Sequence, residues 1–140
     1  MTYYRFTYRW IIPVILIVIL LAGNTASLGA VEQEGLAGAE RHLRTALKTD
    51  PDFPEAAYNL AILVSKENLD ESVRLCRKAH DLRPRDAKYA YTLAFYLQQK
   101  GKLEEAIAIL QKLVQQQPNF TDAGMLLRAL YEQQKTPKEQ

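Results

Sequence analysis

The chain has 140 residues with 18 basic and 16 acidic side chains, so its net charge is +2. This length suits one domain, and 48% hydrophobic with 24% charged residues excludes a disordered chain. Arg5 and Arg9 supply the whole positive excess, and a neutral remainder argues against nucleic-acid binding. The single cysteine, Cys76, excludes an intramolecular disulfide. With two histidines it also leaves no zinc site of the usual spacing.

The N-terminal segment is the most hydrophobic part of the sequence. Residues 10–22 are apolar throughout, and no charged residue occurs between Arg9 and Glu32. The apolar run alone has the length of a signal-peptide core, whereas residues 10–30 together are long enough to span a membrane. Aromatic residues crowd the N-terminal side of the run, and no clear cleavage site follows it. We therefore expect a transmembrane signal anchor at 10–30, with a cleaved signal peptide or a buried helix as alternatives.

The charges that flank this segment predict its orientation. Arg5 and Arg9 precede the span and Glu32 and Glu34 follow it, so residues 1–9 are expected to remain in the cytoplasm. For a bacterial source, this predicts a single-pass protein of the cytoplasmic membrane with its main domain in the periplasm. Signal cleavage would instead give a secreted or periplasmic protein.

A repeat governs the rest of the chain, which has helical rather than strand-like periodicity. Pro51, Pro84 and Pro118 recur at a nearly constant interval, and each follows an apolar helical pattern that it ends. The tetrapeptide Tyr58-Asn59-Leu60-Ala61 corresponds to Tyr91-Thr92-Leu93-Ala94, one such interval later. The sequence therefore predicts an all-α chain of repeated helix pairs.

This pattern resembles the tetratricopeptide repeat, a helix–turn–helix unit whose length of about 34 residues matches the interval between the prolines. Leu93, Ala94 and Leu97 and the later Ala106, Leu110, Leu113 and Pro118 occupy the positions of its signature, although Ala57 and Ala90 replace the signature tryptophan. The first full copy is one residue short near its turn. The resemblance implies a short solenoid of about six helices, in which Leu60, Leu93 and Leu127 fill the seams between paired helices.

The copies divide the chain after the expected anchor. We predict a domain at 31–134 that is composed of a half repeat (31–51), two full repeats (52–84 and 85–118) and a final half repeat (119–134), followed by a polar tail (135–140). The first helix that would complete the initial half repeat falls on residues 18–33, which overlap the apolar segment.

In this family the first helix of each pair lines a concave groove. The resemblance places nine residues in a partner-binding groove: Glu55, Tyr58, Asn59, Ile62, Lys88, Tyr91, Thr92, Phe95 and Gln99. On the last helix, Asp122, Met125, Leu126 and Ala129 follow them. Two tyrosines and a phenylalanine among polar groups suit a peptide or helical ligand. The alternative is that Tyr58, Tyr91 and Phe95 only pack against neighbouring repeats.

The remaining candidate residues have ordinary interpretations. Cys76 is expected to be a buried small residue rather than a reactive thiol. His42 and His80 are expected to be solvated or capping residues, and Lys100, Lys102 and Lys112 solvated charges. No nucleophile–base pair, phosphate-binding loop or metal motif is present, so we expect no catalytic residues, no metal, no cofactor and no small-molecule substrate.

The function that the resemblance implies is protein binding without enzymatic activity. We expect a membrane-anchored repeat protein that binds or scaffolds a partner protein at the extracytoplasmic membrane surface, as an assembly factor or an accessory subunit. The alternatives are a structural subunit of a larger respiratory or cytochrome complex, and a secreted repeat protein after signal cleavage.

Overall fold

A computed structural model of the protein describes residues 35–135, and these residues form six helices and no strand. The predicted segments 1–9 and 10–30 lie outside the described residues, as does all of the expected tail except Lys135. Within residues 35–135, no helix is both long enough and apolar enough to cross a membrane. The predicted all-α class and the number of helices are confirmed for the part of the chain that can be seen.

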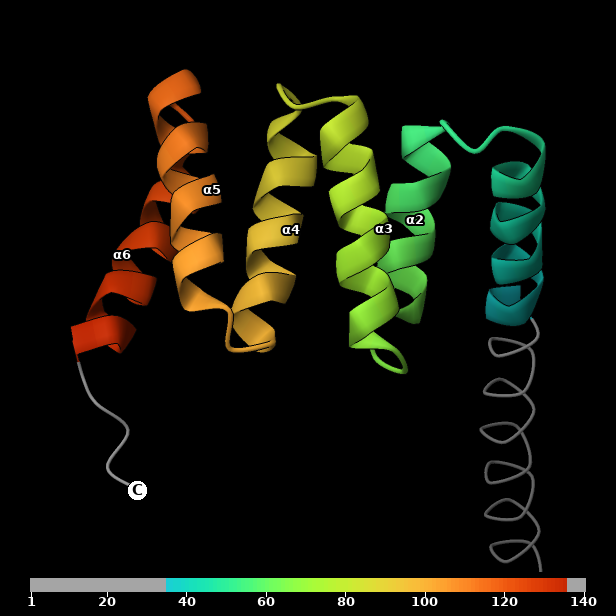
Figure 1. Ribbon diagram of the computed structural model, residues 1–140, viewed down its shortest axis with the longest axis horizontal. Coiled ribbons are helices and arrows are strands. Elements are labelled where there is room, and N and C mark those ends of the chain that lie inside the picture. The colour runs from blue at the N-terminus through green and yellow to red at the C-terminus, as the bar shows by residue number, and fades with distance from the viewer. Residues whose placement is uncertain (1–34, 136–140) are drawn as a thin grey trace, which may run out of the picture. The chain divides into compact units, whose positions relative to one another are not determined.

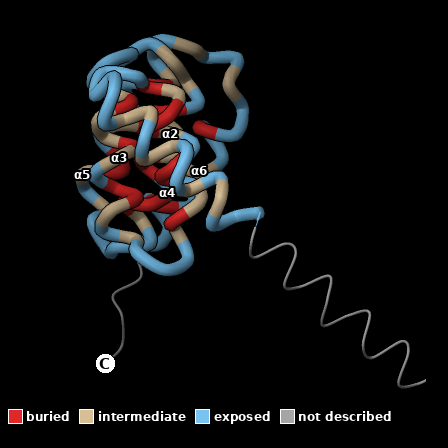
Figure 2. Tube along the Cα trace, turned by 90° about the vertical axis from the view of Figure 1, so that its right-hand side faces the viewer, coloured by how far each residue is buried: buried red, intermediate tan, exposed pale blue. Residues whose placement is uncertain are grey.

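The helices follow one another as a stack of antiparallel neighbours. Residues 35–49 are helical, and five further helices follow: α2 (Pro54–Val64), α3 (Leu69–Leu82), α4 (Ala87–Gln99), α5 (Leu103–Gln116) and α6 (Thr121–Lys135). From α2 onward each helix packs against the next one in the chain, so α2 to α6 form a solenoid (Figure 1). Residues 40–135 belong to one compact unit, in which the buried residues lie inside the stack (Figure 2).

Local signals in the sequence explain where the helices begin and end. Asn68 and Asp86 cap α3 and α4, because their side-chain oxygens accept from the amides of Glu71 and Lys88, each at 3.0 Å. Pro54 occupies the first turn of α2, where its missing amide costs nothing. After α4 the chain turns at Gly101, whose φ of 73° is a left-handed conformation that favours glycine.

The predicted seams are filled by the expected side chains in both full repeats. Leu60 and Leu93 are buried, as that position requires, and the small residues Ala61 and Ala94 beside them are fully buried. Cys76 is buried as predicted. Desolvation raises the pKa of its thiol to about 12, so the thiolate form that reacts is scarce at neutral pH.

A second column of buried residues runs along the first helices, and its member Tyr89 packs against Ala57 and Ala79 of the preceding repeat. Ala56, Tyr89 and Ala123, which occupy equivalent positions in successive repeats, are all buried. The expectation that Leu127 fills a buried seam is wrong: Leu127 is only half-buried, whereas Leu130 is fully buried. The reason is that α6 packs on α5, while residues 35–135 contain no second helix after α6 to cover Leu127.

The first full repeat compensates for its missing residue with a serine. Helix α2 ends at Val64, and the backbone amide of Ser65 donates a hydrogen bond to the carbonyl of Ile62. The buried Ser72 hydroxyl, on α3, donates to the Ala61 carbonyl at 2.8 Å. In the second full repeat, α4 extends to Gln99. The position that corresponds to Ser72 is occupied there by the buried Ala106. Ser72 therefore supplies a hydrogen bond where the shorter repeat has a shorter helix.

Two ion pairs connect successive second helices at equivalent positions. Arg44, in the helical segment 35–49, binds both carboxylate oxygens of Glu71 on α3, at 2.7 and 3.2 Å. The hydrogen bond from Arg44 lowers the pKa of Glu71. One repeat later, Arg77 on α3 pairs with Glu105 on α5. We call these two pairs, Arg44–Glu71 and Arg77–Glu105, the ion-pair ladder. Because partly exposed ion pairs contribute only about 0–1 kcal/mol each, the ladder contributes more to the alignment of successive second helices than to the stability of the domain.

Candidate partner-binding surface

The nine predicted groove residues lie on α2 and α4, the first helices of the two full repeats. Together with Met125 on α6 they are called here the first-helix face. Tyr58 links the first two of these helices, because its ring packs on Tyr89 at 5.0 Å between centroids and its hydroxyl lies 3.5 Å from that of Thr92. The Lys88 ammonium lies 4.7 Å from the Tyr58 ring centre, a cation–π distance.

Tyr91 repeats this arrangement one repeat later. Its ring packs edge-on against Phe120, at 5.7 Å between centroids, just before α6 begins. Tyr58 and Tyr91 are both half-buried, so each contributes to packing between repeats and leaves part of its surface on the first-helix face. The two interpretations of these tyrosines, groove lining and packing, therefore describe different parts of the same side chains.

The exposed apolar side chains of this face are the ones most available to a partner. Ile62 on α2 is 44% exposed, Phe95 on α4 is 39% exposed and Met125 on α6 is 65% exposed. Phe95 follows Tyr91 by one helical turn, on the same side of α4. The face therefore presents a large apolar side chain on each of the three first helices.

The polar residues of the first-helix face differ in whether they already interact with other side chains of the protein. Glu55 pairs with Arg83 at the end of α3, so its charge is neutralised. Asn59 and Gln99 are exposed. The ammonium of Lys88, itself exposed, lies over the rings of Tyr58 and Tyr89. The face therefore offers amides and one cation around its apolar residues.

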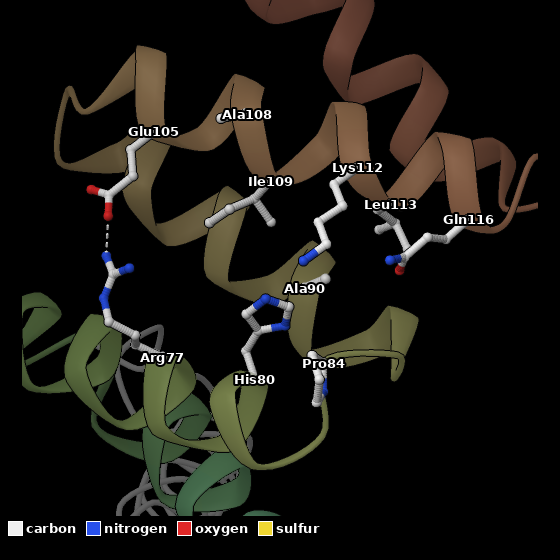
Figure 3. Close-up of a pocket in the computed structure, with 10 residues that line it drawn as sticks. All are labelled: Arg77, His80, Pro84, Ala90, Glu105, Ala108, Ile109, Lys112, Leu113 and Gln116. Carbon is white, nitrogen blue, oxygen red and sulfur yellow. Dashed lines mark hydrogen bonds and ion pairs between the residues drawn. The ribbon is translucent and has the colours of Figure 1, made fainter.

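A pocket that the sequence analysis missed lies between the second helices α3 and α5, with Ala90 of α4 among its lining residues (Figure 3). Its volume is about 290 Å³, and we call it the second-helix pocket. The lining residues are Arg77, His80, Pro84, Ala90, Glu105, Ala108, Ile109, Lys112, Leu113 and Gln116. No member of this set belongs to the first-helix face.

His80, expected to be a solvated or capping residue, lies in the last turn of α3 and is not fully solvated. The residue is half-buried, and its Nδ1 atom is buried without a hydrogen-bond partner among the described residues. Desolvation lowers the pKa of the imidazole, and the nearby Lys112 and Arg77 lower it further against the opposing effect of Asp81. Periodicity alone could not reveal this pocket, because a pocket between helices depends on distances between residues that are far apart in the sequence. His42 is exposed, as expected.

No group of three or more His, Cys, Asp or Glu side chains between residues 35 and 135 is placed to hold a metal ion. Several of the described acidic residues form ion pairs, such as that of Asp52 with Lys78 at 3.7 Å.

Solved structures with the same fold have low sequence identity to the chain. It superposes on MamA with a TM-score of 0.67 at 21% identity, covering 74% of this chain and 61% of MamA. The first TPR of Spaghetti (RPAP3), bound to the HSP90 peptide SRMEEVD, gives a TM-score of 0.67 at 20% identity over 86% of this chain and 93% of that one. A mutant O-GlcNAc transferase of Thermobaculum terrenum matches at 28% identity with a TM-score of 0.60, over 68% of this chain and 18% of the transferase.

The chain thus spans about three fifths of MamA and less than a fifth of the transferase. No curated protein matches the chain significantly. Two family models, both described as tetratricopeptide repeat, match residues 25–87 and 63–130. The first of these matches begins inside the segment 10–30 that was expected to span the membrane. Because the two models together cover residues 25–130 and the helices stack as the repeat requires, the chain contains tetratricopeptide repeats.

Proposed function

We propose that this protein binds a partner protein through its first-helix face, at the extracytoplasmic surface of a membrane, as an assembly factor or accessory subunit without catalytic activity of its own. The observation that carries the proposal is the row of exposed apolar side chains, Ile62, Phe95 and Met125, on three successive first helices. Exposed apolar surface that is rimmed by polar groups is typical of interaction sites.

The arrangement suits an extended peptide or a helix. Aromatic residues commonly dominate the binding energy of interfaces. Phe95 follows the half-buried Tyr91 by one helical turn on α4, and the ammonium of Lys88 lies over the ring of Tyr58. Asn59 and Gln99 can donate to and accept from a peptide backbone. The Spaghetti (RPAP3) domain, which has this fold, is bound to a peptide, and this supports the same class of ligand here.

Truncation of Phe95 tests the proposal. Phe95→Ala is expected to weaken partner binding by about 2 kcal/mol, or roughly thirtyfold in affinity, because the exposed ring is lost from the middle helix of the face. The measurement compares the protein that co-purifies with the tagged full chain and with the variant from a detergent extract, and follows helicity by circular dichroism.

Leu82→Ala is the matched control. Leu82 is 38% exposed, against 39% for Phe95, but it lies at the end of α3 and outside the first-helix face. Binding should survive Leu82→Ala. Equal loss of the partner from both variants, or retention by Phe95→Ala with an intact fold, would place the interface elsewhere.

The location at the membrane is the second part of the proposal. It is supported by the uncharged segment 10–30 with Arg5 and Arg9 before it and Glu32 after it. In a bacterial host, protease added to intact spheroplasts is expected to digest the repeats and to spare the anchor. Protection of the repeats would reverse the orientation. A mature N-terminus beyond residue 22, seen by mass measurement, would instead indicate signal cleavage and a secreted or periplasmic protein.

A further inference from the structure

We propose that the second-helix pocket binds a carboxylate carried on an apolar stem. The pocket is separate from the first-helix face, because it is lined by α3, the turn that follows α3, α5 and Ala90. The proposal does not depend on which protein occupies the first-helix face. It rests on the charges, the apolar wall and the size of the pocket.

Of the two basic residues that line the pocket, one is available to bind an anionic ligand. Arg77 and Glu105 pair with each other, and Lys102 approaches the same carboxylate at 3.7 Å. Lys112 forms no ion pair or hydrogen bond with any other described residue, and its ammonium reaches from α5 toward the His80 ring of α3 (Figure 3). A single uncompensated positive charge suits a monovalent carboxylate better than a phosphate, which carries nearly two charges at neutral pH.

Two neutral polar groups and an apolar wall complete the site. The His80 ring lies beside Lys112, and the Gln116 amide lies one helical turn further along α5 (Figure 3). Pro84, Ala90, Ile109 and Leu113 form the apolar part of the lining. A ligand with a charged end and a short hydrocarbon or aromatic part would pair with Lys112 and cover these side chains.

The volume limits the size of the ligand. Pockets for drug-sized molecules begin at about 300 Å³, and this pocket holds about 290 Å³. The part of a ligand that lies inside the pocket is therefore small, such as a short free acid or the last residue of a polypeptide with its terminal carboxylate. These two sources share the chemistry of the proposed site, and a direct comparison distinguishes them.

The experiment titrates the full chain in non-ionic detergent with hexanoate and, separately, with an acetylated Gly-Ala-Leu tripeptide that has a free carboxyl terminus. Binding is followed by the methyl NMR signals of Ile109 and Leu113. The neutral controls are hexanamide and the tripeptide amide. We expect both methyl groups to respond to the acids. Tighter binding of the tripeptide would identify a polypeptide terminus as the source, and tighter binding of hexanoate a free acid.

Lys112→Met removes the charge and keeps the length of the stem. It is expected to weaken the binding of both acids about threefold to fivefold, the upper end of what an ion pair at an exposed lysine contributes. Lys66→Met is the matched control, because Lys66 is exposed in the turn after α2, outside the pocket. Unchanged affinity in Lys112→Met, equal binding of acids and amides, or no response at Ile109 and Leu113 would each overturn the proposal.

Discussion

Leu93→Ala is expected to destabilise the repeat domain by about 2–5 kcal/mol. Leu93 is fully buried in the main core, together with Ala61, Cys76, Ala94 and Leu110, so truncation leaves a cavity that α3, α4 and α5 all border. A small domain has only about 5–15 kcal/mol of stability. Since 1 kcal/mol lowers the melting temperature of a domain of 60–100 residues by about 4–8 °C, the helical signal in circular dichroism should melt at least about 8 °C earlier.

Leu82→Ala provides the comparison for this experiment as well. It removes the same atoms from a side chain that is 38% exposed, so its effect on melting should be much smaller. If both variants melted like the native chain, Leu93 would not face the seam between α4 and α5.

Tyr89 is the second position where a large effect is expected. Two substitutions there distinguish the contribution of the ring from that of the hydroxyl. The ring is fully buried in a small cluster with Ala57 and Ala79, and it contacts Tyr58. Tyr89→Ala should therefore cost about 3–5 kcal/mol. The Tyr89 hydroxyl has no hydrogen-bond partner among the described residues. Tyr89→Phe should accordingly be neutral or stabilising by up to about 1 kcal/mol, since an unpaired buried hydroxyl is costly.

Chemical denaturation of the native chain and of both variants, followed by circular dichroism, measures the two free energies. A loss of more than about 1 kcal/mol in Tyr89→Phe would contradict the assignment of the hydroxyl as unpaired. A small effect of Tyr89→Ala would mean that the contact between α2 and α4 contributes little to the stack.

The repeat period was sufficient to predict the helix pairs and their seams. Leu60 and Leu93 were recognised because the family signature names the positions that face the partner helix of the same pair. The column that faces the preceding repeat was missed, although it is equally regular: Ala56, Tyr89 and Ala123 stand at the same position of successive copies. The signature contains no residue at this position, and comparison of the copies with each other was needed to see it.

The last helix shows why a signature position does not guarantee burial. Leu127 has the seam position, but burial of a seam requires the second helix of the pair, and residues 35–135 end with the first.

The partner-binding surface was predictable to a similar extent. The period placed Ile62 and Phe95 on one side of their helices, whereas the contacts of Tyr58 with Tyr89 and of Tyr91 with Phe120 depend on the distance between repeats.

The ion-pair ladder has a consequence for self-association. Inside the chain, an arginine on one second helix meets a glutamate on the next, but within residues 35–135 neither end of the ladder carries an unused arginine or glutamate at these positions. At the position of Arg44 and Arg77, α5 carries the neutral Gln111, which binds the Tyr131 hydroxyl. At the position of Glu71, one repeat earlier, stands Gly38. Among the described residues, the arginine–glutamate contact between repeats therefore has no counterpart at either end of the ladder, and a head-to-tail contact between two molecules would lack these ion pairs.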